Sequence, residues 1–156
     1  MKKMSRFVSP ILLAMMALPP AMGAQSACKL ISGHISGQLG APTASCPFGT
    51  ESGTFTGSAG GTFFACVVNM KQHGGGVLVF KLVHTYTTAN GDTFTTSDNI
   101  VAHPLQGPVY RVENHAVITG GTGAYEDAVG FIYDEGTVDL STGVVSVDYQ
   151  GRMCTP

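Results

Sequence analysis

The chain has 156 residues, a formal net charge of −2 and only 12% charged residues, whereas glycine contributes 21 residues. A chain of this length fits a single domain. Abundant glycine with few charges argues against a helical bundle or a coiled coil, and a hydrophobic content of 44% argues against a disordered chain.

Residues 1–23 predict a secretory signal peptide, a helix that precedes the folded domain. A positively charged start is followed by an apolar stretch over 7–18, which is too short to span a bilayer comfortably. Small residues place the cleavage site after Gly23, with Ala24 as the close alternative. We therefore expect an exported protein, periplasmic or secreted, whose folded domain spans 24–156.

Membrane and nucleic-acid partners are not expected for this mature domain. A lipid anchor would need Cys28 as the first mature residue, but Gln25 stands where such sites usually carry an apolar residue. No second apolar run is long enough for a membrane-spanning helix. Five Lys and Arg residues remain against ten Asp and Glu residues, a formal net charge of −5, and they form no basic cluster that would bind nucleic acid.

Short β-rich runs separated by Gly, Asn, Asp and Pro predict eight strands and no long amphipathic helix in the mature domain. The clearest is 77–88, where one apolar face also carries His84 and Tyr86. The pair Asn90-Gly91 that follows is a strong hairpin signal. The eight expected strands are 29–38, 51–57, 61–71, 77–88, 92–103, 109–119, 128–140 and 144–154.

Short turns between these strands favour antiparallel order. Eight antiparallel strands in about 130 residues can close into a barrel, which leaves no free edges and has room for side chains or one small ligand. The fold class expected is therefore all-β, an eight-stranded antiparallel barrel. An open sandwich is the alternative.

Four cysteines in an exported chain predict two disulfides. If the first and last strands pair at closure, Cys28 lies close to Cys154, and Cys46 is left to pair with Cys66. There is no CxxC spacing, and the five histidines lack the paired spacing of a metal site. We expect neither a metal nor a cofactor.

The segment 118–130 reads Ile-Thr-Gly-Gly-Thr-Gly-Ala-Tyr-Glu-Asp-Ala-Val-Gly. It resembles the glycine-rich signature of the allene oxide cyclase-like barrel superfamily, which includes plant dirigent proteins and many small exported bacterial proteins. The hairpin at 84–92 also resembles that family's strand–turn–strand pattern. The resemblance, which covers 77–154, implies a barrel with a pocket for a small apolar molecule. Val129 stands where dirigent proteins typically carry a pocket-facing Arg, so no catalytic residues are transferred.

The glycine-rich segment is expected to form a turn. Gly120, Gly121 and Gly123 can adopt positive φ, and Tyr125 can fold back over one end of the barrel. A phosphate-binding loop would need a helix after the glycines, but the residues after Gly130 are β-rich.

Three residues are the preferred candidates for contact with a ligand. Tyr133 lies on the face that the resemblance makes pocket-facing, and Tyr149 lies on a face with two valines of the last strand. A buried tyrosine hydroxyl needs a partner, either a polar group of the core or a ligand. His84 is likewise either a satisfied core histidine or a third anchor for the ligand.

Arg111, Glu113 and His115 alternate along one strand and point the same way. At a barrel mouth they could hold and protonate a ligand. The opposite face of that strand, with Val112, Ala116 and Ile118, is apolar, which favours the alternative, a solvated outer face with weak ion pairs. Asp98 fits either a lone acid in a pocket or a polar outer face.

The function expected first is an exported barrel that binds a small, largely apolar molecule and steers its cyclisation or isomerisation, as the resemblance implies. The alternative is a non-catalytic envelope or secreted structural protein whose barrel is filled by its own side chains, which a cavity below about 300 Å³ would favour. No G-x-S-x-G motif occurs, which argues against a serine hydrolase.

Overall fold

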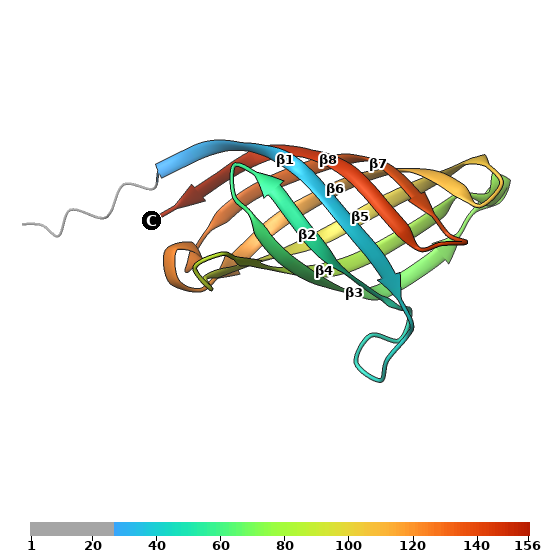
Figure 1. The fold of residues 1–156 in the computed structure, drawn as a ribbon, viewed down its shortest axis with the longest axis horizontal. Helices are drawn as coiled ribbons and strands as arrows, with labels where there is room; N and C mark the ends of the chain where they lie inside the picture. Colours follow the sequence, from blue (N-terminus) through green and yellow to red (C-terminus); the bar gives the residue numbers. More distant parts are fainter. Residues whose placement is uncertain (1–26) are drawn as a thin grey trace, which may run out of the picture.

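The computed structural model describes residues 27–156, so the predicted signal peptide over 1–23 and its cleavage site lie outside the described residues. Eight strands form one closed antiparallel barrel in which each strand pairs with its neighbours in sequence and the first pairs with the last (Figure 1). The strands are β1 (Ala27–Gly40), β2 (Thr50–Gly57), β3 (Gly61–Gln72), β4 (Leu78–Thr88), β5 (Thr93–Gln106), β6 (Val109–Gly121), β7 (Val129–Asp139) and β8 (Val144–Thr155). The predicted all-β barrel is confirmed, and the open sandwich is wrong.

The two ends of the barrel carry different connections (Figure 1). The end that we call the termini end holds both ends of the described chain and the loops 58–60, 89–92 and 122–128. The opposite end, called the β1–β2 end, holds the long loop over 41–49 and the connections that follow β3, β5 and β7.

The fifth strand is longer than expected, because Pro104 does not end it. Pro104 pairs with Tyr110 of β6, and the register shifts between Pro104 and Gln106. Proline lacks a backbone N–H, and a strand tolerates it at such an irregularity. The hairpin at Asn90-Gly91 is confirmed, although its loop spans 89–92 rather than two residues.

Both predicted disulfides are present, Cys28–Cys154 and Cys46–Cys66. The first joins directly paired positions of β1 and β8, at the seam where the barrel closes. The second ties the loop over 41–49 to β3.

The glycine-rich turn behaves largely as predicted. Gly120 and Gly123 have φ of 118° and 58°. Gly121 does not have a positive φ, but a Cβ there would lie 2.0 Å from the backbone oxygen of Thr93. Tyr125 packs against Phe94 at the termini end, with ring centroids 5.4 Å apart. The turn therefore needs glycine for two reasons, conformation and the close approach of β5.

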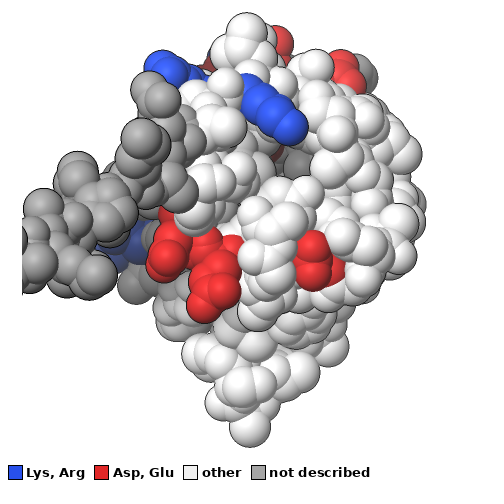
Figure 2. All heavy atoms as spheres, turned by 90° about the vertical axis from the view of Figure 1, so that its left-hand side faces the viewer, with Lys and Arg blue, Asp and Glu red and all other residues white. Residues whose placement is uncertain are grey.

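Figure 2 views the termini end and shows charged side chains scattered over a mostly uncharged surface. On this face of the described residues, Lys and Arg do not gather into one patch. Within residues 27–156 there is also no helix with the length and apolarity needed to cross a membrane.

Candidate functional site

A cavity of about 240 Å³ opens at the β1–β2 end. Its walls are mainly aliphatic and aromatic side chains, and its rim includes the exposed residues Phe48, Met70 and Leu140. The apolar wall residues include Leu39, Leu78, Phe80, Leu82, Ile100, Val112, Val138, Val145 and Val147. The enclosure suits a small apolar molecule.

Polar side chains interrupt this apolar lining at its inner part. We call Glu51, His84, Thr96, Asp98, Asn114 and Asp134 the interior polar cluster; all six are buried. Four of them contact the cavity directly: Glu51, His84, Asn114 and Asp134. Charged groups are rarely buried unless they are paired, so this cluster is the most unusual feature of the barrel interior.

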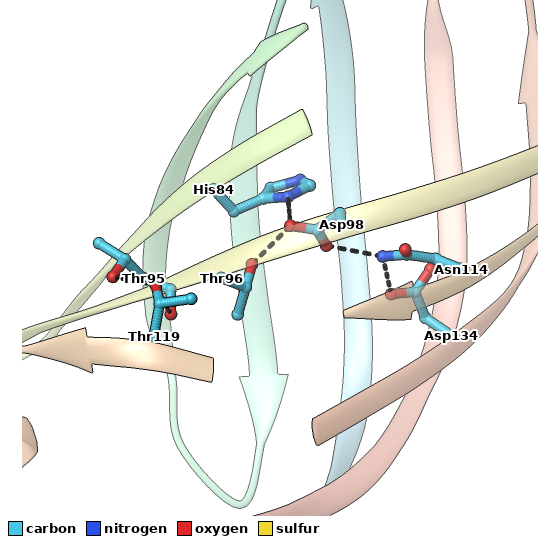
Figure 3. A network of polar contacts seen from close by, with 7 residues as sticks. All are labelled: His84, Thr95, Thr96, Asp98, Asn114, Thr119 and Asp134. Atoms are coloured by element: carbon cyan, nitrogen blue, oxygen red, sulfur yellow. Dashed lines mark hydrogen bonds and ion pairs between the residues drawn. The ribbon is translucent and has the colours of Figure 1, made fainter. Parts of the chain in front are cut away.

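Hydrogen bonds connect most of the cluster (Figure 3). Asp98 accepts hydrogen bonds from Thr96 Oγ1 at 2.7 Å and from Asn114 Nδ2 at 2.8 Å. Asn114 Nδ2 also donates to Asp134 Oδ2 at 2.9 Å. His84 Nδ1 forms an ion pair with Asp98 Oδ2 at 3.1 Å, without the alignment of a hydrogen bond. The amide of Asn114 thus bridges two carboxylates.

Strand register brings these side chains to one level of the barrel. His84 on β4 is paired with Thr96 on β5, and Asn114 on β6 is paired with Asp134 on β7. Because side chains alternate along a strand, Asp98 points inward with Thr96. The cluster therefore crosses four consecutive strands, and Glu51 on β2 adds a further acid.

Burial and the charges of neighbouring groups shift the pKa values of the acids in the cluster. Burial raises the pKa of Asp134 to about 6. Burial also raises the pKa of Glu51, against the opposing effect of the His84 charge. For Asp98, burial is outweighed by His84 and by the hydrogen bonds from Asn114 and Thr96, so its pKa is lowered. A carboxyl that titrates near neutral pH is a candidate proton donor or acceptor.

The pKa of His84 moves upward. Burial alone would lower it, but the contact with Asp98 and the negative charges of Glu51 and Asp134 outweigh burial. The imidazolium form of His84 is thus stabilised inside the barrel by its acidic neighbours.

A second cavity, of about 230 Å³, lies at the termini end. Phe55, Phe94, Tyr125 and Tyr149 are among its lining residues. The Tyr149 hydroxyl donates to the backbone oxygen of Thr56 at 3.1 Å. That partner is a polar group of the protein itself, which is the first of the two possibilities expected for a buried tyrosine.

The two cavities are separate, and the side chains of Ile35 and Tyr86 border both. His84 lines the cavity at the β1–β2 end, whereas Tyr149 lines the cavity at the termini end. Both residues point inward as expected, but the structure does not bring them together in one site.

Tyr133 does not point into the barrel, although it lines an open hollow on the outer surface with Asp134 and Tyr149. Its side chain lies on the outer surface, 49% exposed, and stacks on His115 with ring centroids 4.7 Å apart. The reason is strand alternation: Ile132 and Asp134 point inward, so Tyr133 and Val129 point outward.

Arg111, Glu113 and His115 also lie on the outer face, because Val112, Asn114 and Ala116 alternate with them and are buried. Arg111 forms an ion pair with Glu113 at 2.5 Å, and both side chains are about half exposed. The outer-face alternative is therefore the correct interpretation of these three residues.

Sequence reasoning missed Glu51 and Asp134 and left Asp98 open. Alternation carried a signal for Asn114 and Asp98, since each shares a face with apolar residues of its own strand. Within the described chain, no group of three or more His, Cys, Asp or Glu side chains has a geometry that could hold a metal ion.

Known proteins resemble this chain in structure, whereas no family model and no curated protein matches its sequence. The chain is similar to the structure of a pterocarpan synthase dirigent protein, with 15% sequence identity and a TM-score of 0.49. The match covers 92% of this chain and 99% of the other. The closed eight-stranded architecture itself agrees with the barrel that the glycine-rich segment implied.

Proposed function

We propose that this barrel binds a small, largely apolar molecule in the cavity at the β1–β2 end, where the interior polar cluster contacts its polar group. One observation carries the proposal. Asn114 Oδ1 is buried without a hydrogen-bond partner among the described residues, in a side chain that lines an otherwise apolar cavity. Buried polar atoms in native proteins nearly always have a partner, and a ligand supplies one here.

The energetic cost of the cluster supports the same proposal. An unpaired buried polar atom costs about 1–3 kcal/mol, and well-packed apolar side chains are often more stabilising than buried charges. A barrel that served only as a scaffold would gain stability from apolar residues at Glu51 and Asp134. The presence of acids at these positions is explained by contact with a ligand.

The volume of the cavity at the β1–β2 end limits the size of the ligand. About 150 Å³ is enough for benzene, and drug-sized molecules occupy about 300–1,000 Å³. A cavity of about 240 Å³ therefore fits a single ring that carries a short substituent.

Steering of a cyclisation or an isomerisation is the chemistry that we propose for such a ligand. An enclosed apolar cavity restricts the conformers of the bound molecule, and this restriction favours one product. Asp134, whose pKa is about 6, can exchange a proton with the ligand near neutral pH. No covalent attachment to the protein is required.

We place this activity outside the cytoplasm, in the periplasm or the medium. Two disulfides form and persist in an oxidising compartment. The predicted signal peptide over 1–23 supports the same location.

The alternative function, a structural barrel filled by its own side chains, has one specific observation in its favour. Each of the two cavities is smaller than about 300 Å³, because Ile35 and Tyr86 divide the interior.

A pair of neighbouring valines separates the two functions. Val145 lines the cavity and is 8% exposed, whereas Val144 is on the outer face and 49% exposed. We would screen single-ring fragments by ligand-detected NMR against the wild type, Val145→Phe and Val144→Phe. Binding that is lost in Val145→Phe and kept in Val144→Phe supports the proposal. No binding to the wild type, or equal binding to both variants, contradicts it.

A further inference from the structure

We propose that the ligand of the β1–β2 cavity is an amine, whose ammonium group lies against Glu51, Asp134 and the free oxygen of Asn114. This inference rests on the function proposed above and specifies the chemical class of its ligand. It follows from the balance of charge, and of hydrogen-bond donors and acceptors, inside the barrel.

Negative charge exceeds positive charge inside the barrel. The interior polar cluster contains three carboxyl groups, those of Glu51, Asp98 and Asp134, and one basic group, the imidazole of His84. Every Lys and Arg of the described chain is exposed, namely Lys29, Lys71, Lys81, Arg111 and Arg152. With all four cluster groups ionised, the interior therefore carries a net charge of −2.

The existing contacts within the cluster leave Glu51 and Asp134 as the uncompensated acids. Asp98 is paired with His84 and accepts two hydrogen bonds. Asp134 accepts one hydrogen bond, from Asn114. Glu51 also lines the cavity, and its carboxyl accepts no side-chain hydrogen bond from another described residue. Burial and the nearby charges of His84 and Asp98 are what shift its pKa.

Asn114 Oδ1 and the carboxyl of Glu51 are free acceptors in the cavity lining, beside His84, whose Nδ1 also lacks a hydrogen bond and can only donate when the ring is charged. The Asn114 amide nitrogen is used by the two aspartates, which leaves Asn114 Oδ1 without a partner. An ammonium group has three donors, no acceptor and a positive charge. It matches three acceptors that include two carboxylates, whereas an anion would be repelled and an alcohol would offer one neutral donor.

Binding of an ammonium group should depend on pH. The groups that face Asp134 from the surrounding strands are Glu51 on β2, His84 and Tyr86 on β4, Asp98 on β5, Asn114 on β6 and, on β8, Tyr149, the register partner of Asp134. Protonation of Asp134 and Glu51 removes the charge that attracts a cation, so affinity falls as the pH drops below about 6. Loss of the His84 proton at higher pH makes the interior more negative and strengthens binding.

Three probes of similar size test the inference by calorimetry: 2-phenylethylamine, 2-phenylethanol and 3-phenylpropionate. At pH 8 we expect the amine to bind at least about tenfold more tightly than the alcohol, and the carboxylate to bind more weakly still. Between pH 8 and pH 5 the amine should lose about tenfold in affinity, because Asp134 becomes protonated.

Matched variants show which carboxyl groups account for the affinity for the amine. Asp134→Asn and Glu51→Gln each remove one interior charge, whereas Glu135→Gln removes one charge from the outer face of the same strand as Asp134. Each interior variant should weaken the amine about tenfold at pH 8 and leave the alcohol within about twofold. The outer variant should change neither. Circular dichroism of each variant identifies any loss of the fold.

The outcomes separate this inference from the function on which it rests. If the alcohol or the carboxylate binds as tightly as the amine, and Val145→Phe abolishes that binding, the amine inference is wrong and the binding function stands. If none of the three probes and no single-ring fragment binds the wild type, both are wrong. Equal loss of amine binding in Glu135→Gln also contradicts the inference, because a general surface charge would then explain the attraction.

Discussion

His84 on β4 and Asp98 on β5 form an ion pair inside the barrel, with 3.1 Å between Nδ1 and Oδ2 and almost no exposure of either side chain. The pair raises the pKa of His84 and lowers the pKa of Asp98, although burial acts in the opposite direction on each. Its two charges offset each other. The remaining acids, Asp134 and Glu51, are those that burial makes harder to ionise.

These shifts predict that the protein is most stable in mildly acidic solution. The stabilisation from Asp98 is present above its unfolded pKa of 3.8 and is lost as the pH falls through its lowered folded pKa. The stabilisation from His84 is present below 6.5 and is lost as the pH rises through its raised pKa. Asp134 is harder to ionise in the folded protein, so it lowers the free energy of unfolding as the pH rises from 3.8 to about 6. Thermal unfolding should give a maximum Tm between about pH 4 and 6, and a maximum above pH 8 would contradict these shifts.

Asp134→Asn should stabilise the protein at alkaline pH. Ionisation of Asp134 costs free energy in the folded protein, because folding raises the pKa of this carboxyl from 3.8 to about 6. That difference corresponds to about 3 kcal/mol, which asparagine avoids. Denaturant unfolding should show a gain approaching this value at pH 8 and a much smaller gain at pH 4. Glu135→Gln, on the outer face of β7, should show no such pH-dependent gain; a wild type as stable as Asp134→Asn at pH 8 would refute the burial cost.

The two disulfides should contribute unequally. Cys28 and Cys154 are 126 residues apart, whereas Cys46 and Cys66 are 20 apart. Chain-entropy arithmetic gives about 5 kcal/mol for the long loop and about 3 kcal/mol for the short one. Replacing each pair by alanine and measuring unfolding in urea compares them. If loss of Cys46–Cys66 is the more damaging change, loop entropy does not control their effect.

Close approach of β5 and β6 makes Gly121 intolerant of a side chain. A Cβ at Gly121 would lie 2.0 Å from the Thr93 backbone oxygen, so Gly121→Ala should destabilise the barrel by about 2 kcal/mol or more. Gly74 is a matched control, since a Cβ there meets nothing within 4 Å. Gly74→Ala should stay within about 0.5 kcal/mol of the wild type. Equal unfolding free energies for the two variants would disprove the steric explanation.

Local pattern was sufficient to predict the barrel. Apolar alternation placed His84 and Tyr86 inward on β4, and short turns implied antiparallel neighbours. Pairing of the first and last strands then identified Cys28 and Cys154 as partners. Each of these inferences depends on a few adjacent residues or on closure alone.

The interior acids were harder to predict, for a physical reason. Both faces of β7 carry apolar residues, so alternation alone does not decide whether Tyr133 or Asp134 points inward. Charged residues are rarely buried, which makes a sequence-based assignment of Glu51 or Asp134 to the interior improbable. Their meeting with His84 depends on strands that are distant in sequence, and only the closed barrel brings them together.

Native mass spectrometry of the protein purified from its own host, compared with the mass after denaturation, is the most direct test of whether the cavity at the β1–β2 end holds a ligand. Occupation of the cavity predicts a native mass that exceeds the denatured mass by one small molecule, and loss of this excess in Val145→Phe but not in Val144→Phe. Equal native and denatured masses for the wild type and both variants would contradict the binding account and favour a barrel filled by its own side chains.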